Sequence, residues 1–294
     1  MYMQNKASAI FGELRSLLGG PQLKHQFHRI QRLVHRASPQ EQTEVLIPYC
    51  LDQLKGWPLE SRVVTFKGSQ RAHLRDTLAT TWELRNVTSS KDFVQDALET
   101  FDGLQPQARI ARLRVYASDL EDTDLGALLH LPLLSGIEEL RLQDNGLNFS
   151  DKTSLSPSLI PNLRTLCLRD NLVTSGFMIP LLKGELAPNI ETVTMTPDSS
   201  YFLWPHAKNA LPLAPTLRHL SLALCHPVSP GDLEWIIEDS HFQNLETLCL
   251  TPLLTRESDI LHRMSISPNL SPAVRAQYAE LSAERERYIA LYAY

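Results

Sequence analysis

The chain of 294 residues contains neither a long apolar run nor a familiar catalytic motif. No stretch approaches about 18 consecutive apolar residues, the length at which a membrane-spanning helix is suspected. The first ten residues lack a basic segment followed by an apolar one, so we expect no secretory signal. Glycine-rich phosphate-binding loops, nucleophile-elbow motifs and zinc-protease motifs do not occur either. These absences argue against a membrane protein and leave no candidate catalytic residues.

Cysteine is scarce, and the few cysteines form no Cys-x-x-Cys pair and have no histidine at metal-finger spacing. His25 and His28 lie three residues apart, but no carboxylate or cysteine ligand is close to them in the sequence. We therefore predict no metal site and no cofactor. Cysteines without a disulfide framework favour a reducing, cytoplasmic compartment. They are Cys50, Cys167, Cys225 and Cys249.

The charge and the hydrophobicity of the chain are ordinary. Lys and Arg number 28, Asp and Glu number 33, the formal net charge is -5, and 43% of the residues are hydrophobic. This composition is typical of a globular protein and excludes a disordered chain, a collagen or a disulfide-rich miniprotein. Nothing in the charge balance requires nucleic acid or an anionic membrane as a partner.

The strongest pattern is an internal repeat. Six segments follow the spacing apolar-x-x-apolar-x-apolar, at start-to-start intervals of 27, 26, 27, 27 and 28 residues. We expect each segment to form a short strand whose first, fourth and sixth side chains point into a core shared with neighbouring parallel strands. The segments begin at Ile110, Ile137, Leu163, Ile190, Leu217 and Leu245.

The third segment is the most complete. It reads Leu163-Arg-Thr-Leu-Cys-Leu-Arg-Asp-Asn171, and apolar residues follow in its second half. This pattern resembles the leucine-rich repeat family, and the period near 27 is similar to its ribonuclease-inhibitor-like subclass. The resemblance implies an α/β solenoid, a short arc of parallel strands with a helical or irregular convex side. It also implies a ninth-position side chain that bonds to loop backbone: Ser118, Asn145, Asn171, Asp198, Cys225 and Leu253 occupy that position.

The flanks of the repeats lead us to predict four segments along the chain. Residues 1–58 form a helical N-terminal module, in which Ser38 to Glu41 is a capping box that starts a helix. Residues 59–109 form a linker and an N-terminal capping repeat, and residues 110–256 hold the repeats. Residues 257–294 contain a helix from Pro272 that either caps the array or serves as a partner helix for dimerisation.

The concave side of such an arc carries the third, fifth and seventh residues of each repeat. Arg and Tyr, which are enriched among residues that dominate interface energies, gather there in the first three repeats. One hypothesis is that they bind an acidic or phosphorylated surface. The alternative is a solvated ladder in which Glu139 offsets two neighbouring arginines. The candidate partner-binding residues are Arg112, Arg114, Tyr116, Arg141, Gln143 and Arg169.

A second candidate site lies on the helix predicted at residues 22–37. Five Lys and Arg residues and no acidic residue occur between Leu14 and Gln40. This face is either an anion-binding site or a solvated face paired with acidic groups elsewhere in the fold. Aromatic residues are not interleaved with the charges, which disfavours nucleic acid as the ligand. The candidate anion-binding residues are Lys24, His28, Arg29, Arg32 and Arg36.

These observations predict a non-catalytic protein, either an interaction module or a scaffold, that recognises another protein on its concave strand face. The order of a helical module before the repeats also resembles the F-box substrate receptors of ubiquitin ligases, which would make the chain an adaptor. Anion or nucleic-acid binding through residues 22–37 is the other alternative. The oligomeric state is left open.

Overall fold

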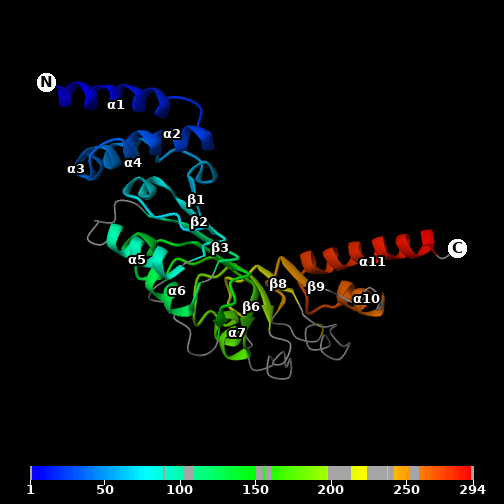
Figure 1. The fold of residues 1–294 in the computed structure, drawn as a ribbon. Coiled ribbons are helices and arrows are strands. Elements are labelled where there is room, and N and C mark those ends of the chain that lie inside the picture. Colours follow the sequence, from blue (N-terminus) through cyan, green and yellow to red (C-terminus); the bar gives the residue numbers. More distant parts are fainter. Residues whose placement is uncertain are drawn as a thin grey trace. The chain divides into compact units, whose positions relative to one another are not determined.

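The computed structural model describes residues 2–88, 90–101, 109–118, 120–149, 155, 160–197, 213–223, 237, 242–251 and 258–292. It is a mixed α/β structure with a nine-stranded sheet in the order β1-β2-β3-β4-β6-β7-β8-β9, and β5 pairs with β6 (Figure 1). Every pairing with a defined register is parallel, so the predicted α/β class and strand direction are confirmed. The chain divides into a first unit, Met1–Leu140, and a second unit, Arg141–Tyr294, which are described separately.

The first unit opens with helices, as the sequence predicted. The capping box is formed, because the Ser38 amide donates to the Glu41 carboxylate at 2.9 Å and the Glu41 amide donates to the Ser38 hydroxyl at 3.3 Å. A π-helical turn precedes Pro48, whose nitrogen cannot donate to the helix ladder. The helices are α1 (Tyr2–Leu18), α2 (Lys24–His35), α3 (Pro39–Glu41), the π-turn η1 (Gln42–Leu46) and α4 (Ile47–Gln53).

A buried arginine joins this helical block to the segment before the second strand. Arg62 is 8% exposed and donates two hydrogen bonds to the Leu78 carbonyl, at 2.7 and 3.1 Å, and one to the Leu54 carbonyl at 3.2 Å. Burial lowers the pKa of Arg62 to about 10, so the guanidinium stays charged at neutral pH. Its hydrogen bonds satisfy carbonyl groups at the ends of two short helices, where helix carbonyls lack internal partners.

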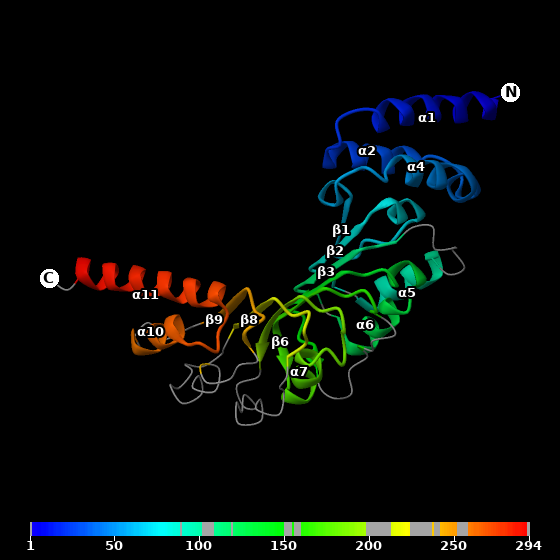
Figure 2. The same cartoon turned by 180° about the vertical axis from the view of Figure 1, so that it is seen from behind.

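Two strands precede the first predicted repeat and continue the same parallel pairing. The register aligns Thr65 of β1 with Glu83 of β2, and Glu83 with Arg114 of β3. Helices α5 and α6 connect β2 to β3 and β3 to β4, and both views place them beside these strands (Figures 1 and 2). The elements are η2 (Leu59–Ser61), β1 (Val63–Lys67), η3 (Leu74–Leu78), β2 (Thr81–Arg85), α5 (Ser90–Phe101), β3 (Arg112–Tyr116), α6 (Asp122–Leu129), η4 (Pro132–Leu134) and β4 (Glu139–Gln143).

A left-handed backbone turn marks the repeat in β1 and β2 as well as in the later strands. In each turn one residue has a positive φ, between 45° and 58°. In four cases this residue comes directly after a strand, and in the fifth it lies within one. Gly, Asn and Asp tolerate this conformation, whereas an alanine there carries a cost of about 1–2 kcal/mol. Strands β1 and β2 lie within residues 59–109, where the sequence led us to expect a linker and a capping repeat, although their spacing departs from the period near 27. The five residues are Gly68, Asn86, Ala117, Asp144 and Asp170.

The inward side chains form the core. In all six predicted repeats the first, fourth and sixth residues are at most 2% exposed, so the predicted inward positions are confirmed. In the first unit Trp82 is fully buried, and its ring centroid lies 5.5 Å from Phe66 and 5.2 Å from Phe101. Its indole N–H donates to the Asp76 carbonyl at 3.2 Å, which satisfies its polar atom inside the core.

The second unit continues with strands and one connecting helix. Its strand β6 spans nine residues and pairs with β5 near its end, where the register with β7 shifts. Helix α7 connects β6 to β7 and buries Phe177, whose ring packs 5.1 Å from that of Phe149. The elements are β5 (Asn148–Phe149), β6 (Thr165–Val173), α7 (Ser175–Leu182), β7 (Thr192–Pro197), β8 (His219–Ala223) and β9 (Thr247–Thr251).

The ninth position of the repeat carries buried polar side chains that bond to loop backbone, as predicted. The Asn171 side-chain oxygen accepts from the amides of Asn145 and Leu147, at 3.3 and 3.1 Å, and its NH₂ group donates to the carbonyls of Leu142 and Arg169. The prediction is also confirmed at Asn145 and Ser118, which bond to backbone groups in the same way. The remaining three positions, Asp198, Cys225 and Leu253, lie outside the described residues.

Two C-terminal helices, α10 (Ser258–Ile266) and α11 (Pro272–Tyr292), lie side by side next to β9 in both views (Figures 1 and 2). Gln277 of α11 accepts from the Leu248 amide at 3.3 Å and donates to the Leu248 carbonyl at 3.0 Å, and the Tyr278 hydroxyl donates to the same carbonyl. Because β9 is the last strand of the sheet, this contact covers part of an otherwise unpaired edge. None of the helices within the described residues is both long and apolar enough to cross a membrane.

Replacing Asn171 by alanine is expected to lower the free energy of unfolding by an order of 1–3 kcal/mol, because the buried amides of Asn145 and Leu147 lose their acceptor. Chemical denaturation measures the change. Asn189→Ala is the matched control, since Asn189 is exposed and donates one hydrogen bond to a loop carbonyl. Equal effects of the two substitutions would contradict the role given to Asn171.

Replacing Gln277 by alanine is expected to uncover the Leu248 backbone and to promote self-association through β9, because unpaired strand edges are templates for pairing. Sedimentation velocity over a range of concentrations measures the association. Gln95→Ala serves as control, because Gln95 bonds only to Glu99 on the exposed side of α5 among the described residues. A Gln277→Ala variant that stays as monodisperse as the control would refute the edge-covering role.

Candidate interaction surface

The outward side of β3 and β4 in the first unit carries a three-member ion-pair cluster. Nε of Arg114 donates to Oε1 of Glu139 at 2.8 Å, and Nε of Arg112 lies 3.5 Å from Oε2 of the same carboxylate. Burial opposes the charge of Arg114, but the hydrogen bond and the charge of Glu139 outweigh it and raise the pKa of Arg114. The sequence left two possibilities for these arginines, an unpaired cluster or a ladder in which Glu139 offsets two of them. The observed arrangement is the ladder.

A second cluster lies on the outward side of β1 and β2. Glu83 accepts from Arg85 at 2.7 Å and from the Thr65 hydroxyl at 3.1 Å, and it is 8% exposed. Burial alone raises the pKa of Glu83, but these two hydrogen bonds and the positive charges of Arg85 and Lys24 lower it overall. The Arg85 guanidinium also stacks over the Tyr116 ring, 4.9 Å from its centroid. Each charged group of this cluster is therefore held in place by a neighbour.

The remaining predicted partner-binding residues belong to the second unit. Arg141 and Gln143 are half-buried on β4, and Gln143 donates to the Asp170 carboxylate at 3.5 Å. Arg169 is exposed on β6. The structure thus separates the six predicted residues into two sets, one in each unit. Glu83, Arg85 and Thr65 were not predicted, because their strands lie outside the regular repeat period.

The predicted basic helix is α2, and its charged residues do not act as one group. Lys24, His28 and Arg32 are four residues apart and share one face, whereas Arg29 lies on another side, 4.0 Å from Glu13 of α1. His28 is half-buried, and its Nδ1 lies 3.2 Å from the Gln31 side-chain oxygen. Arg36, the last of the five, follows the end of the helix and is exposed.

Two of these residues line a cavity of about 270 Å³ in the first unit, together with residues from β1 and from the loop before η3. The loop and the start of η3 contribute three basic side chains that were not predicted, namely Arg71 and His73 from the loop and Arg75 from η3. The available signal was the concentration of basic residues in the short segment Arg71-Ala-His73-Leu-Arg75. The cavity is lined by His28, Gln31, Arg32, Val64, Thr65, Phe66, Gln70, Arg71, His73, Arg75 and Asp76.

Asp76 is the one carboxylate in this lining and is almost fully buried. It accepts from the His73 amide at 2.8 Å and from the Gln31 amide group at 3.3 Å, and Arg75 lies 3.8 Å away. Burial raises the pKa of Asp76 to about 6, although the His73 amide and Arg75 act in the opposite direction. Burial and then the charge of Arg75 also lower the pKa of His73.

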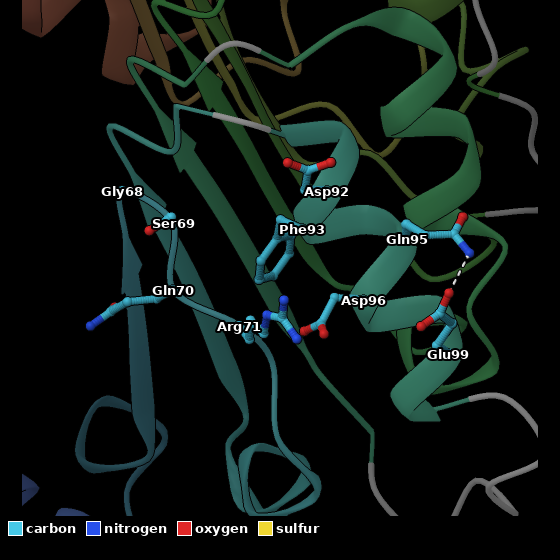
Figure 3. Close-up of a pocket in the computed structure, with 9 residues that line it drawn as sticks. All are labelled: Gly68, Ser69, Gln70, Arg71, Asp92, Phe93, Gln95, Asp96 and Glu99. Atoms are coloured by element: carbon cyan, nitrogen blue, oxygen red, sulfur yellow. Dashed lines mark hydrogen bonds between the residues drawn. The ribbon is translucent and has the colours of Figure 1, made fainter.

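A second cavity, of about 320 Å³, lies between the loop after β1 and helix α5 (Figure 3). Its lining is acidic and includes Asp92, Asp96 and Glu99, and Arg71 extends toward Asp96. Asp96 accepts from the Ala72 amide at 2.8 Å, which fixes the loop against the helix. Within the described residues no group of three or more His, Cys, Asp or Glu side chains is placed to hold a metal ion.

The described cysteines are unpaired. Cys50 is buried, and burial raises the pKa of its thiol to about 12, so it is a packing residue. Cys167 and Cys249 are half-buried on β6 and β9 and are separated by three strand intervals, or roughly 14 Å. They lie too far apart to form a disulfide bond.

Comparison with known proteins gives no further guidance, since no protein-family model and no curated protein matches the chain at a significant level.

The raised pKa of Asp76 predicts a pH dependence of stability. Because the folded-state pKa, about 6, exceeds the ordinary aspartate pKa of 3.8, Asp76 contributes stability that is fully present below about pH 4 and is lost as the pH rises through about 6. Replacing Asp76 by asparagine removes this loss. The unfolding free energy of Asp76→Asn minus that of the wild type is therefore expected to rise by roughly 3 kcal/mol between pH 4 and pH 7.

Urea denaturation at several pH values measures this difference. The control is Asp52→Asn, because Asp52 is exposed and its pKa is lowered by the hydrogen bond from Lys55. The control difference should change with the opposite sign over the acidic range. A difference for Asp76→Asn that stays constant with pH would contradict the buried, raised-pKa carboxyl.

Proposed function

We propose that the chain is a non-catalytic binding protein of the leucine-rich repeat type, which recognises another protein through the outward side chains of its parallel strands. Its repeats form a solenoid, and the outward side is the concave face. The three described cysteines are free, which supports a reducing, cytoplasmic setting.

The repeat assignment is supported by the coincidence of pattern and structure. Each predicted segment begins two residues before a strand, and its inward positions are buried. Asn171 makes the backbone bonds that the family resemblance implies. Helices α5, α6 and α7 each connect one strand to the next parallel strand, as expected for the convex side of such repeats.

The observation that carries the binding proposal is the ordered outward surface of β1 to β4 in the first unit. Glu83 is held by Thr65 and Arg85, and Glu139 is held by Arg112 and Arg114. Side chains that are already ordered lose little conformational entropy on binding, so a contact made here retains more of its favourable free energy.

The same surface indicates the chemistry of the partner. Because both carboxylates already pair with arginines, the surface is electrically mixed rather than strongly cationic. We therefore expect a partner surface that offers both charge signs around an apolar or aromatic centre, and binding that depends weakly on salt. Tyr116 and the guanidinium of Arg85 that stacks on it supply the aromatic centre on this side.

The test is quantitative affinity capture from lysate of the source cells, with mass-spectrometric readout. A double variant, Arg114→Gln with Tyr116→Ala, is expected to lose the specific partner by about tenfold or more, because both residues lie at the centre of the ordered surface. The two substitutions change half-buried outward positions, so only a small loss of stability is expected.

Arg164→Gln provides the matched control. Arg164 also forms an ion pair with a glutamate, Glu191, but its side chain is 58% exposed and lies outside the strands. Retention of the same proteins by wild type, control and double variant alike would refute the outward strand face as the binding surface.

A further inference from the structure

The cavity beside α2 combines residues that are distant in the sequence into one basic site. His28 and Arg32 come from α2, Arg71 and His73 come from the loop before η3, Arg75 comes from η3 itself, and Thr65 comes from β1. Three of these side chains are arginines, which stay protonated at every physiological pH. Arginines from two separate segments of the chain therefore line one cavity that is open to solvent.

The charges in this cavity do not cancel. Among its lining residues only Asp76 is acidic, and its carboxyl group is already occupied by the His73 amide, Gln31 and Arg75. Within the described part of the chain, no ion pair joins Arg32 to a carboxylate, whereas Arg71 also lines the second cavity and extends toward Asp96 there (Figure 3). Three arginines and one ionised aspartate leave a net charge of about +2 at neutral pH.

The same positive charge contributes to the lowered pKa values of two neighbouring histidines. After burial, the charge of Arg75 is the next cause that lowers the pKa of both His35 and His73, and the two rings lie 5.0 Å apart. An anion in the cavity would relieve this repulsion. Gln70 also belongs to the lining of the cavity. Its side-chain oxygen accepts from the Lys67 amide, so its NH₂ group is the part that can donate to a ligand.

The volume restricts the class of ligand. At about 270 Å³ the cavity is smaller than the roughly 300–1,000 Å³ of pockets that bury drug-sized molecules, so it suits a single polar group and not a whole nucleotide. A carboxylate carries one negative charge, whereas a phosphate monoester carries about 1.5 to 2 at pH 7 and offers three oxygen acceptors. Guanidinium groups match such oxygens with paired hydrogen bonds.

We propose that the cavity between α2, β1 and the loop before η3 is a binding site for a phosphoryl group, in which Arg32, Arg71 and Arg75 provide the principal contacts. The net charge of the lining matches that of a phosphate dianion, and the separate origins of the arginines surround it from two sides. His28 and Thr65 lie at the same cavity and supply further polar contacts. The site does not depend on the proposed strand-face function, since its arginines are not part of that surface; the two share only Thr65, whose hydroxyl donates to Glu83.

The experiment titrates the full chain with inorganic phosphate at pH 7.5 and constant ionic strength. Calorimetry measures the affinity, and the ring-proton NMR signals of His28 and His73 report the location. Saturable binding with shifts of both rings is expected. Arg32→Gln is expected to weaken binding by about tenfold or more, because it removes a charge-assisted contact. Arg32 is exposed and forms no ion pair within the described residues, so the variant should fold normally.

Arg36→Gln is the control for net charge. It removes the same charge four residues further along the chain, at an exposed position outside the cavity lining. The proposal predicts that this variant keeps the affinity within about twofold, since an exposed charge outside the cavity is screened by salt. Equal weakening by both variants, or no saturable binding by the wild type, would overturn it.

Two probes distinguish the source of the phosphoryl group. An alanine pentapeptide with a central phosphoserine that binds more tightly than inorganic phosphate would assign the site to a phosphorylated chain, and equal binding would assign it to a free phosphate. The unphosphorylated peptide should not bind. The Arg114→Gln, Tyr116→Ala variant should bind phosphate like the wild type, so failure of the strand-face proposal and failure of this one are separable.

Discussion

The rest of the structure depends on one constraint: a single repeat has too little apolar surface to bury its own inward side chains. Each of the six predicted repeats presents three such side chains on one side, and they reach an exposed fraction of at most 2% only because a parallel neighbour lies beside them. Each buried aliphatic side chain contributes roughly 1.5–3 kcal/mol, so the pairing direction and register are strongly determined. The outward positions are then fixed as a consequence, since successive side chains alternate between the two sides.

The loops obey a second constraint, that buried backbone groups need hydrogen-bond partners. Asn171 satisfies four of them at one turn, and Ser118 satisfies two at another. At the edge of the sheet, Gln277 bonds to both the backbone amide and the backbone carbonyl of Leu248. Near the N-terminal helices it is Arg62 that bonds to the carbonyl groups of Leu54 and Leu78. Polar side chains are therefore buried where the chain turns or ends, and the strand interiors are apolar.

The two candidate sites differ in how their charges are balanced. On the outward strand face each carboxylate is shared between basic or hydroxyl neighbours, as Glu139 is between Arg112 and Arg114, and this balance orders the surface. In the cavity beside α2 the single aspartate of the lining is buried and already bonded, and Arg32 forms no ion pair within the described residues. The first arrangement favours a polar protein surface as ligand, and the second favours a compact anion.

The sequence by itself determined the α/β class, the parallel strands and the inward side chains from Ile110 onward, because each follows from local spacing, while the bonding role of Asn171 was expected from the resemblance to leucine-rich repeats. Within residues 59–109 it led us to expect a linker and a capping repeat, but it did not determine how β1 and β2 pair in the sheet, because their spacing departs from the period near 27. Nor did it determine that Arg71 and Arg75 meet Arg32 in one cavity. Contacts between segments some 40 residues apart depend on how helices pack beside a strand, and that packing is decided by tertiary structure, because no local periodicity encodes it.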